Sequence, residues 1–293
     1  KEYINFSLNN KEYKTIMEST SERGFSFYEK PNQNKKKILV LGDSFVVNQY
    51  HGNESAFWNI LREKINKKYD YQFYVAGAPG YSSVQQLVLL KEIIKDIEPD
   101  IFILGFCTFN DFFENNSNLG NLGIIRYQTN FRPYYDIEND NIGKLNHYGN
   151  KIYRFLFNSY FFRKIDNIFM RVQQRFYKDF YYNIDENLLN ESINVTEIII
   201  SKMRNLVGKD KLFISLDCAV KPNKYHKIWK KIILDLEGYP IDQIGMEIYE
   251  LSKTNKQLIH SDDFHLSAEG QKLYGIKLFN YLDENFFKKV KSN

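Results

Sequence analysis

A serine, a histidine and an aspartate lie at positions whose local pattern suits nucleophilic acyl transfer. Ser44 follows Gly42 and Asp43 directly after four apolar residues. Such a run is typical of a buried strand, and the glycine marks a turn at its carboxyl end. His265 stands three residues after Asp262, a spacing that lets a carboxylate orient the imidazole while its other nitrogen takes a hydroxyl proton. The pattern predicts a nucleophile, a base and an orienting group.

Each of these patterns also has an ordinary structural interpretation. Asp43 or Ser44 would serve as the N-cap of a helix that starts at this turn, because Asp and Ser are preferred there. An aspartate three residues before a histidine is common among surface residues. Asp263 is a rival to Asp262 as the orienting carboxylate. The catalytic interpretation therefore needs further groups, above all donors for the oxyanion of an acyl-transfer intermediate.

Such donors follow two further predicted strands. Gly80 lies in a loop rich in glycine and proline, and it offers a backbone N–H that no side chain obstructs. Asn110 follows a buried apolar run and offers a side-chain amide. The N–H of Ser44, at a helix start, would be a third donor. A turn glycine and a loop-forming asparagine are the alternative interpretations of the first two.

Alternating strands and helices must bring these segments together. Apolar runs predict buried strands, and apolar residues at helical spacing predict the helices between them. The predicted strands are residues 37–41, 71–76, 100–106 and 212–216, and the predicted helices are residues 54–69, 84–97, 195–206, 223–236 and 268–285. Units of this kind predict right-handed crossovers and a parallel sheet, whose carboxyl edge carries the site in open α/β folds. Residues 238–240 are predicted to form a turn.

Two parts of the chain depart from this pattern. Residues 1–36 are polar and mixed, and we expect an irregular lead-in with one short helix near residues 13–19. Residues 37–293 then form one domain, with an insertion at about 112–190 that shows no clear strand. Within it, residues 151–182 interleave aromatic and basic side chains. This mixture suits a lid over the substrate, a segment lying on a membrane surface, or a helical insert whose aromatic residues pack on the sheet.

The composition narrows the class of protein. With 43% hydrophobic residues the chain can bury a sizeable core, and its net charge of +4 gives no sign of nucleic-acid binding. No apolar run reaches the ~18 residues of a membrane-spanning helix. Cys107 and Cys218 cannot form a disulfide framework and are expected to be buried thiols, with a bridge between them as the alternative. His147, His226 and His260 have no partners at ligand spacing, so no metal site is expected.

Four segments resemble the sequence blocks of the SGNH hydrolases, also called the GDSL family, and they occur in the family's order. Block I is similar to residues 42–45, block II to the loop that ends in Gly80, block III to residues 108–111, and block V to Asp262-x-x-His265. The resemblance covers about residues 37–111 and 210–285. Two departures are a threonine at position 108, where block III usually has glycine, and a phenylalanine at position 45, where leucine is more frequent.

The resemblance implies a flavodoxin-like, three-layer α/β/α fold with a five-stranded parallel sheet and a helical insertion. It implies a serine esterase in which Ser44 is the nucleophile, His265 the base and Asp262 its orienting group. The oxyanion hole would consist of Gly80, Asn110 and the Ser44 amide. No cofactor is implied.

For the substrate, the resemblance favours O-acetyl esters on a carbohydrate, because relatives outside the membrane with such lead-ins often act on cell-surface or secreted polysaccharide. The alternatives are an O-acetyltransferase acting on a glycan, a lipase or thioesterase, and a non-catalytic glycan-binding protein with the same fold. The expected partner is a small-molecule or glycan ester. The expected location is extracytoplasmic, with a membrane tether upstream of Lys1 as an option and the cytoplasm as the alternative.

Overall fold

The structure is a computed structural model. It describes residues 2–6, 12–16, 25–48, 51–108, 110–116, 133–144, 185–218, 221, 223–259 and 265–288. The chain divides into two compact units: the larger comprises Lys1–Tyr81, Gln86–Phe109 and Ser201–Asn293, and the smaller comprises Ser82–Gln85 and Asn110–Ile200. Ser44, Gly80 and His265 therefore belong to the larger unit, and Asn110 belongs to the smaller one.

A six-stranded sheet forms the core of the larger unit. Five of its strands are parallel and lie in the order β10-β9-β6-β4-β5. Their bounds are β4 Lys36–Gly42, β5 Tyr71–Gly77, β6 Ile101–Phe106, β9 Leu212–Asp217 and β10 Tyr239–Ile241. Numbered along the chain, the five strands have the order 2-1-3-4-5, which is the flavodoxin-like order. The predicted five-stranded parallel sheet is confirmed.

The lead-in contains strands rather than irregular chain. β3 (Phe25–Phe27) pairs antiparallel with β5 and adds a sixth strand at the edge of the sheet. β1 (Glu2–Phe6) and β2 (Glu12–Ile16) form a separate antiparallel pair. The prediction of an irregular lead-in with a helix near residues 13–19 is therefore wrong. Strands of three to five residues are too short for their alternation to stand out within a polar sequence.

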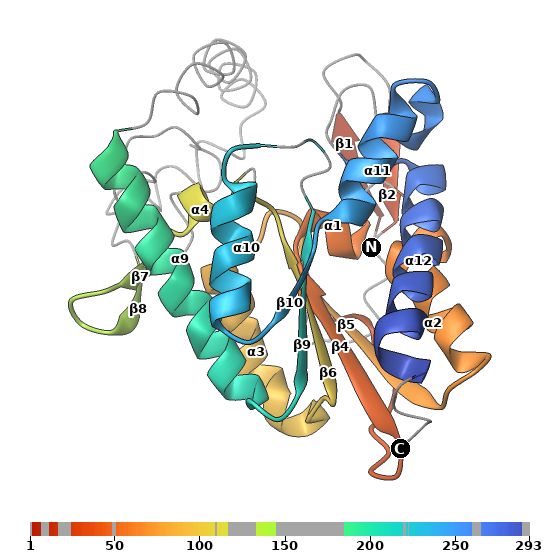
Figure 1. Ribbon diagram of the computed structural model, residues 1–293, viewed down its shortest axis with the longest axis horizontal. Coiled ribbons are helices and arrows are strands. Elements are labelled where there is room, and N and C mark those ends of the chain that lie inside the picture. The colour runs from red at the N-terminus through yellow and green to blue at the C-terminus, as the bar shows by residue number, and fades with distance from the viewer. Residues whose placement is uncertain are drawn as a thin grey trace. The chain divides into compact units, whose positions relative to one another are not determined.

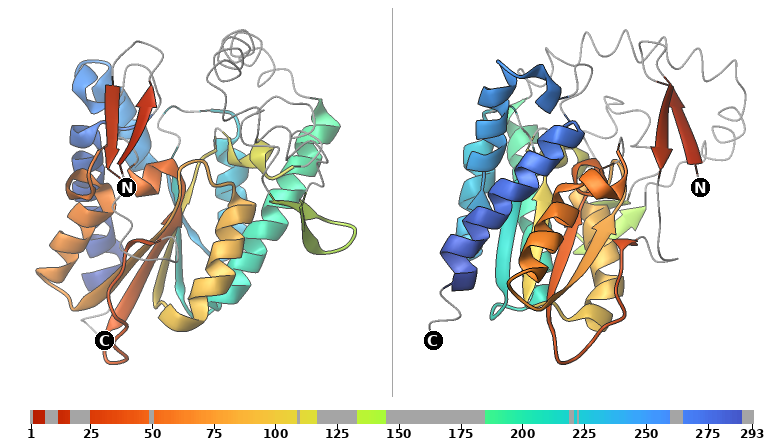
Figure 2. Two further views of the ribbon diagram at one scale, coloured as in Figure 1. Left: turned by 180° about the vertical axis from the view of Figure 1, so that it is seen from behind. Right: turned by 90° about the vertical axis from the view of Figure 1, so that its right-hand side faces the viewer.

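Helices cover both faces of the sheet (Figures 1 and 2). On one face lie α2 (Phe57–Asn66), α11 (Gln243–Ser252) and α12 (Ala268–Leu282), and on the other lie α3 (Ser83–Ile97) and α10 (His226–Asp235). Successive side chains of β4 point to opposite faces of the sheet. Ile38 and Val40 pack in the cluster with α2, α11 and α12, and Leu39 and Leu41, on the other face, are equally buried. Burial on both faces explains why the parallel strands read as continuous apolar runs.

The C-terminal part of the chain differs from the prediction at three places. β10 occupies the stretch predicted as a turn, and Pro240 is tolerated because an edge strand does not need every N–H group. α11 and a 3₁₀ helix at Lys256–Leu258 lie in the stretch after β10, for which no element was predicted. α12 ends at Leu282, and a π-helical turn, Asp283–Phe287, follows it.

The smaller unit contains a hairpin and helices. Its elements are α4 (Asp111–Glu114), β7 (Pro133–Asp136), β8 (Asn141–Lys144) and most of α9 (Glu186–Val207). β7 and β8 pair antiparallel, so the prediction that residues 112–190 hold no strand is wrong for this hairpin. α9 begins at Glu186 rather than near residue 195. The aromatic and basic segment at residues 151–182 lies outside the described residues.

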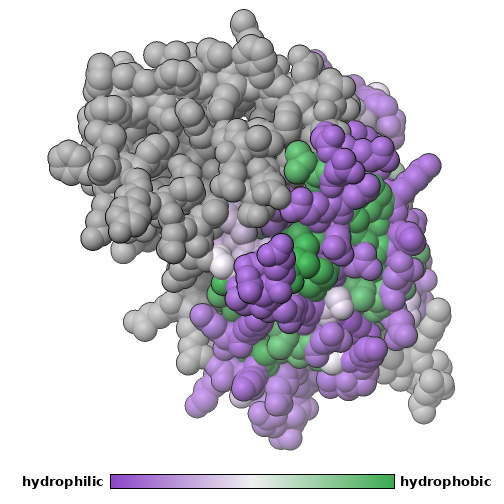
Figure 3. Space-filling model, turned by 90° about the vertical axis from the view of Figure 1, so that its left-hand side faces the viewer, coloured by the Kyte–Doolittle hydropathy of each residue, from purple (hydrophilic) through white to green (hydrophobic). Residues whose placement is uncertain are grey.

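The surface drawn in colour in Figure 3 is largely hydrophilic, with small groups of hydrophobic side chains between the polar ones. The large hydrophobic side chains that are exposed in the described part of the chain are Tyr28, Ile137, Leu206, Leu234, Tyr239, Leu251 and Ile276. They come from different elements, and scattered apolar residues of this kind are normal on a protein surface. None of the helices within the described ranges has the length and apolar character needed to cross a membrane.

Candidate active site

The turn that carries Ser44 begins where β4 ends. α1 (Ser44–Val47) follows at once, and Asp43 is its N-cap: the Asp43 carboxylate accepts a hydrogen bond of 3.0 Å from the N–H of Phe45. The two interpretations of this sequence therefore apply to different residues. Asp43 caps the helix, and the Ser44 hydroxyl is left to make another contact.

A close approach of two backbones holds this turn in place. Gly42 and Gly77 are paired residues at the carboxyl ends of β4 and β5. A Cβ atom at Gly77 would lie 2.0 Å from the carbonyl oxygen of Gly42, and Gly77 has a φ of +148°. Only glycine fits both constraints. The contact between the carboxyl ends of β4 and β5 therefore fixes the position of the Ser44 turn.

His265 lies just before α12, and the two residues that follow it are held in place by hydrogen bonds. Leu266 forms an isolated antiparallel bridge with Ile259. Ser267 is the N-cap of α12: its hydroxyl accepts from the N–H of Gly270 at 3.1 Å, and its own N–H donates to the carbonyl of Leu258 at 3.0 Å. The backbone that follows His265 is thus held by a bridge and a helix cap.

The structure brings Ser44 and His265 together, although 221 positions separate them in the chain. Ser44 Oγ lies 2.6 Å from His265 Nε2, which is hydrogen-bonding distance. Both residues are partly exposed. Asp262 and Asp263 lie outside the described residues, and the identity of the carboxylate that orients His265 stays a prediction.

Aromatic packing joins the Ser44 turn to the helix that follows His265. The rings of Phe45, Phe57 and Tyr274 come from α1, α2 and α12 and pack against one another with centroids 5.2–5.4 Å apart. All three side chains are buried. Edge-to-face and tilted pairs at such distances are favourable, so α1, α2 and α12 form one packed group beneath the Ser44–His265 pair.

The predicted oxyanion donors are placed as follows. The Ser44 N–H starts α1, and among the described residues it makes no hydrogen bond. Gly80 lies in the loop after β5 with a φ of +74°, which favours glycine. In the smaller unit, Asn110 is the N-cap residue of α4, yet its side chain makes no capping bond. The role of these three groups stays a prediction.

A buried polar network at the carboxyl ends of β6, β9 and β10 is absent from the sequence-based prediction. His226 Nδ1 lies 2.7 Å from Asp217 Oδ2, and its Nε2 lies 2.6 Å from Asp242 Oδ2. The Thr108 hydroxyl donates to Asp217 and accepts from the Asn223 amide at 2.7 Å. His226 has no partner at metal-ligand spacing in the sequence, and its two carboxylate partners become apparent only in the fold.

The charges of this network reinforce one another. The hydrogen bond to Asp217 raises the pKa of His226 above its ordinary value and outweighs burial, which would lower it. Burial alone would raise the pKa of Asp242, but hydrogen bonds from His226 and Lys230 outweigh it and hold that pKa below its ordinary value. A carboxylate lies within hydrogen-bonding distance of each ring nitrogen, an arrangement that favours the protonated imidazole. Through Thr108, Asp217 and Asp242 the network also ties the ends of three strands together.

The described residues give no sign of metal chemistry in this region. No group of three or more His, Cys, Asp or Glu side chains among them is arranged to hold a metal ion. Cys107 and Cys218, at the ends of β6 and β9, form no disulfide. Cys218 is buried, as expected for a structural thiol, whereas Cys107 is only partly buried.

Comparisons with known proteins give structural neighbours only. No family model and no curated protein matches the chain. It is similar to a family 3 carbohydrate esterase of Clostridium thermocellum (12% identity, 85% of this chain and 96% of the other, TM-score 0.49). It is also similar to the acetyl xylan esterase AlAXEase (11%, 84% and 99%, 0.47) and to a member of the lipolytic G-D-S-L family from Veillonella parvula (10%, 86% and 98%, 0.44). At these identities and TM-scores, the chemistry of this chain must come from its own residues, above all Ser44 and His265.

Proposed function

We propose that the chain is a serine esterase of SGNH type that removes O-acetyl groups from a carbohydrate. The observation that supports this most directly is the hydrogen bond of 2.6 Å between Ser44 Oγ and His265 Nε2. A hydroxyl on a nitrogen base at a sheet's carboxyl edge is the arrangement that activates a serine for attack on a carbonyl.

In the proposed reaction, Ser44 Oγ attacks the ester carbonyl carbon while its proton passes to His265 Nε2. The carbonyl electron pair moves to oxygen, and the oxyanion is stabilised by the N–H groups of Ser44 and Gly80 and by the Asn110 amide. The intermediate then collapses: the bond to the sugar oxygen breaks, and that oxygen takes the proton from His265. Water, losing a proton to His265, hydrolyses the acetyl-serine in the same way.

The choice of an acetyl group on a carbohydrate comes from the sequence resemblance. An acyl-enzyme of this kind has two fates, because either water or a sugar hydroxyl can take the acetyl group. Of these two acceptors, we propose water. We also propose a short acyl chain, since a lipase or thioesterase would prefer a long one.

The test is the hydrolysis of nitrophenyl acetate and nitrophenyl octanoate, and of an acetylated polysaccharide, by the full chain and by Ser44→Ala. We expect release of acetate by the wild type and a loss of about 10⁴–10⁶-fold in Ser44→Ala. Ser252→Ala, at the end of α11, is the matched control and should retain full activity. Circular dichroism checks that both variants are folded.

The outcomes separate the alternatives. Activity retained in Ser44→Ala would exclude Ser44 as the nucleophile. Faster octanoate hydrolysis would indicate a lipase or thioesterase. Acetyl transfer to a glycan in preference to water, seen as a gain of mass of the glycan, would indicate a transferase. An unreactive wild type that a fluorophosphonate does not label at Ser44 would favour the glycan-binding protein.

A further inference from the structure

Gln271 links the Ser44 turn to the helix that follows His265. It lies in the second turn of α12 and is 2% exposed. The two ends of its side-chain amide bond to different elements. Oε1 accepts from the N–H of Phe57 at 3.0 Å, and Nε2 donates to the carbonyl of Phe45 at 3.3 Å. Phe45 is the residue directly after Ser44.

Both backbone groups need a side-chain partner. Phe57 is the first residue of α2, where the N–H has no intrahelical acceptor, and the N-cap residue Ala56 makes no side-chain capping bond. Phe45 belongs to α1, a helix of only four residues. Carbonyls in such a short helix lie in its last turn and depend on partners from outside. Because both groups are buried, leaving either without a partner is unfavourable.

We infer that Gln271 is a positioning residue that fixes the Ser44 turn against α12 and thereby sets the Ser44–His265 separation. α12 begins three residues after His265, so the helix places the base on one side. The Gln271 amide then fixes the residue next to the nucleophile relative to that same helix. The catalytic consequence of this role rests on the proposed esterase function.

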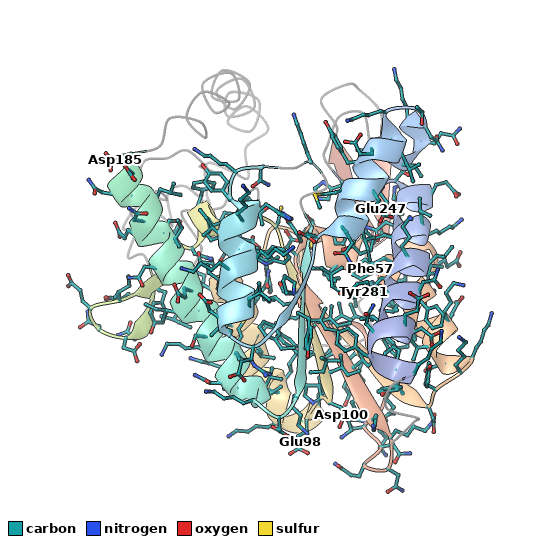
Figure 4. The ribbon with its side chains drawn as sticks, viewed as in Figure 1. Phe57, Glu98, Asp100, Asp185, Glu247 and Tyr281 are labelled. Carbon is teal, nitrogen blue, oxygen red and sulfur yellow. The ribbon has the colours of Figure 1, made fainter. Side chains whose placement is uncertain are left out.

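The surrounding packing gives Gln271 little freedom. A Cβ atom at Gly275, one turn further along α12, would lie 2.5 Å from the carbonyl oxygen of Phe57, so α12 and α2 are in close backbone contact. Tyr274 packs edge-on against both Phe45 and Phe57. Figure 4 shows Phe57 close to α12. A side chain held between two packed helices transmits its position, because close-packed interiors do not deform smoothly.

Two substitutions separate the bonds of Gln271. Gln271→Met has a similar length and can make neither bond. Gln271→Glu can still accept from Phe57, but an ionised carboxylate cannot donate to the Phe45 carbonyl. Ile248→Val and Ile248→Ala are matched controls: Ile248 is fully buried on α11, and these variants weaken the same core cluster while they leave the Gln271 side chain unchanged.

The experiment measures two quantities on the folded full-length variants: the rate of Ser44 labelling by a fluorophosphonate, and the ¹⁵N chemical shift of His265 Nε2. We expect Gln271→Met and Gln271→Glu to label about 10–100-fold more slowly than the wild type, because misplacement by about 1 Å costs up to about 100-fold. Their Nε2 resonance should move towards that of Ser44→Ala. Both Ile248 variants should match the wild type in both readouts.

Wild-type labelling rates and shifts in both Gln271 variants would overturn the inference, and so would equal losses in the Ile248 variants. The chemical shift does not need an active enzyme. If wild-type protein neither hydrolyses esters nor reacts with the fluorophosphonate, the proposed function fails. The positioning role then stands or falls by whether the His265 resonance moves in Gln271→Met and stays in place in Ile248→Ala.

Discussion

The hydroxyl of Thr108 donates a hydrogen bond to the carboxylate of Asp217, with 2.9 Å between Oγ1 and Oδ2. Thr108 stands where the resembled family usually has glycine, and its side chain is fully buried. The threonine therefore has a structural use: it joins the second residue after β6 to the last residue of β9, next to the imidazole of His226.

We expect Thr108→Val to lower the free energy of unfolding by about 1–3 kcal/mol, because it removes a donor from a buried carboxylate while conserving shape. Urea denaturation measures the change. Thr108→Ser is the matched control and should lose less than half as much, since it keeps the hydroxyl. A loss in Thr108→Ser that exceeds the loss in Thr108→Val would show that the methyl group, and not the bond to Asp217, is what stabilises this end of β6.

The raised pKa of His226 predicts a loss of stability at alkaline pH. Folded His226 holds its proton more tightly than the unfolded chain does, so its contribution is fully present below about pH 6.5. It is lost as the pH rises through the raised pKa of the folded state. The unfolding free energy of the wild type relative to His226→Asn should therefore fall as the pH rises above about 6.5. A constant difference over that range would contradict the assigned network.

Asp242 acts in the opposite direction. Its pKa is lowered in the folded state, so its contribution is present above about pH 4 and is lost as the pH falls through the lowered value. The unfolding free energy of the wild type relative to Asp242→Asn should therefore fall on acidification below about pH 4. Urea midpoints at fixed ionic strength measure the alkaline loss due to His226 and the acidic loss due to Asp242. Asp70→Asn, at an exposed carboxylate, serves as the control.

Asn110→Ala separates an oxyanion donor from a helix cap. The Asn110 side chain makes no capping bond to α4, so we expect a change in unfolding free energy within about 0.5 kcal/mol. If the amide stabilises the oxyanion, kcat should fall by about 10²–10³-fold with little change in KM. A loss of stability without a loss of kcat would assign Asn110 to the fold instead.

Gly77→Ala tests the contact between the two strand ends. Its Cβ would lie 2.0 Å from the Gly42 carbonyl oxygen, so the strand ends must separate and the Ser44 turn must move. We expect both the melting temperature and the rate of ester hydrolysis to fall. Gly52→Ala is the control, because a Cβ there meets nothing within 4 Å. Full activity in Gly77→Ala would show that the turn tolerates such a movement.

The sequence predicts the sheet and the Ser44–His265 pair well because both have local signals. β4, β6 and β9 are continuous apolar runs, and Ser44 and His265 stand beside a strand end and a helix start. Gln271 has no such signal, since its partners are 214 and 226 positions away. A glutamine in an amphipathic helix reads as a surface residue until the packing of α12 is known.

Asp242 was missed for a related reason. It directly follows β10, whose three residues include a proline, and the stretch reads as a turn. Without that strand, the carboxylate has no recognised place at the edge of the sheet. A prediction from the spacing of residues along the chain then finds no acceptor for the Nε2 of His226. An error in one short strand therefore removes a whole polar network from the prediction.

The two outermost strands of the central sheet, β3 and β10, are three residues long. Short border strands leave few unpaired N–H and C=O groups for a strand of another molecule to pair with, and Pro240 removes one more donor. Each long parallel strand is covered by at least one neighbour on either side. A sheet bordered in this way resists pairing edge to edge with the central sheet of a second copy.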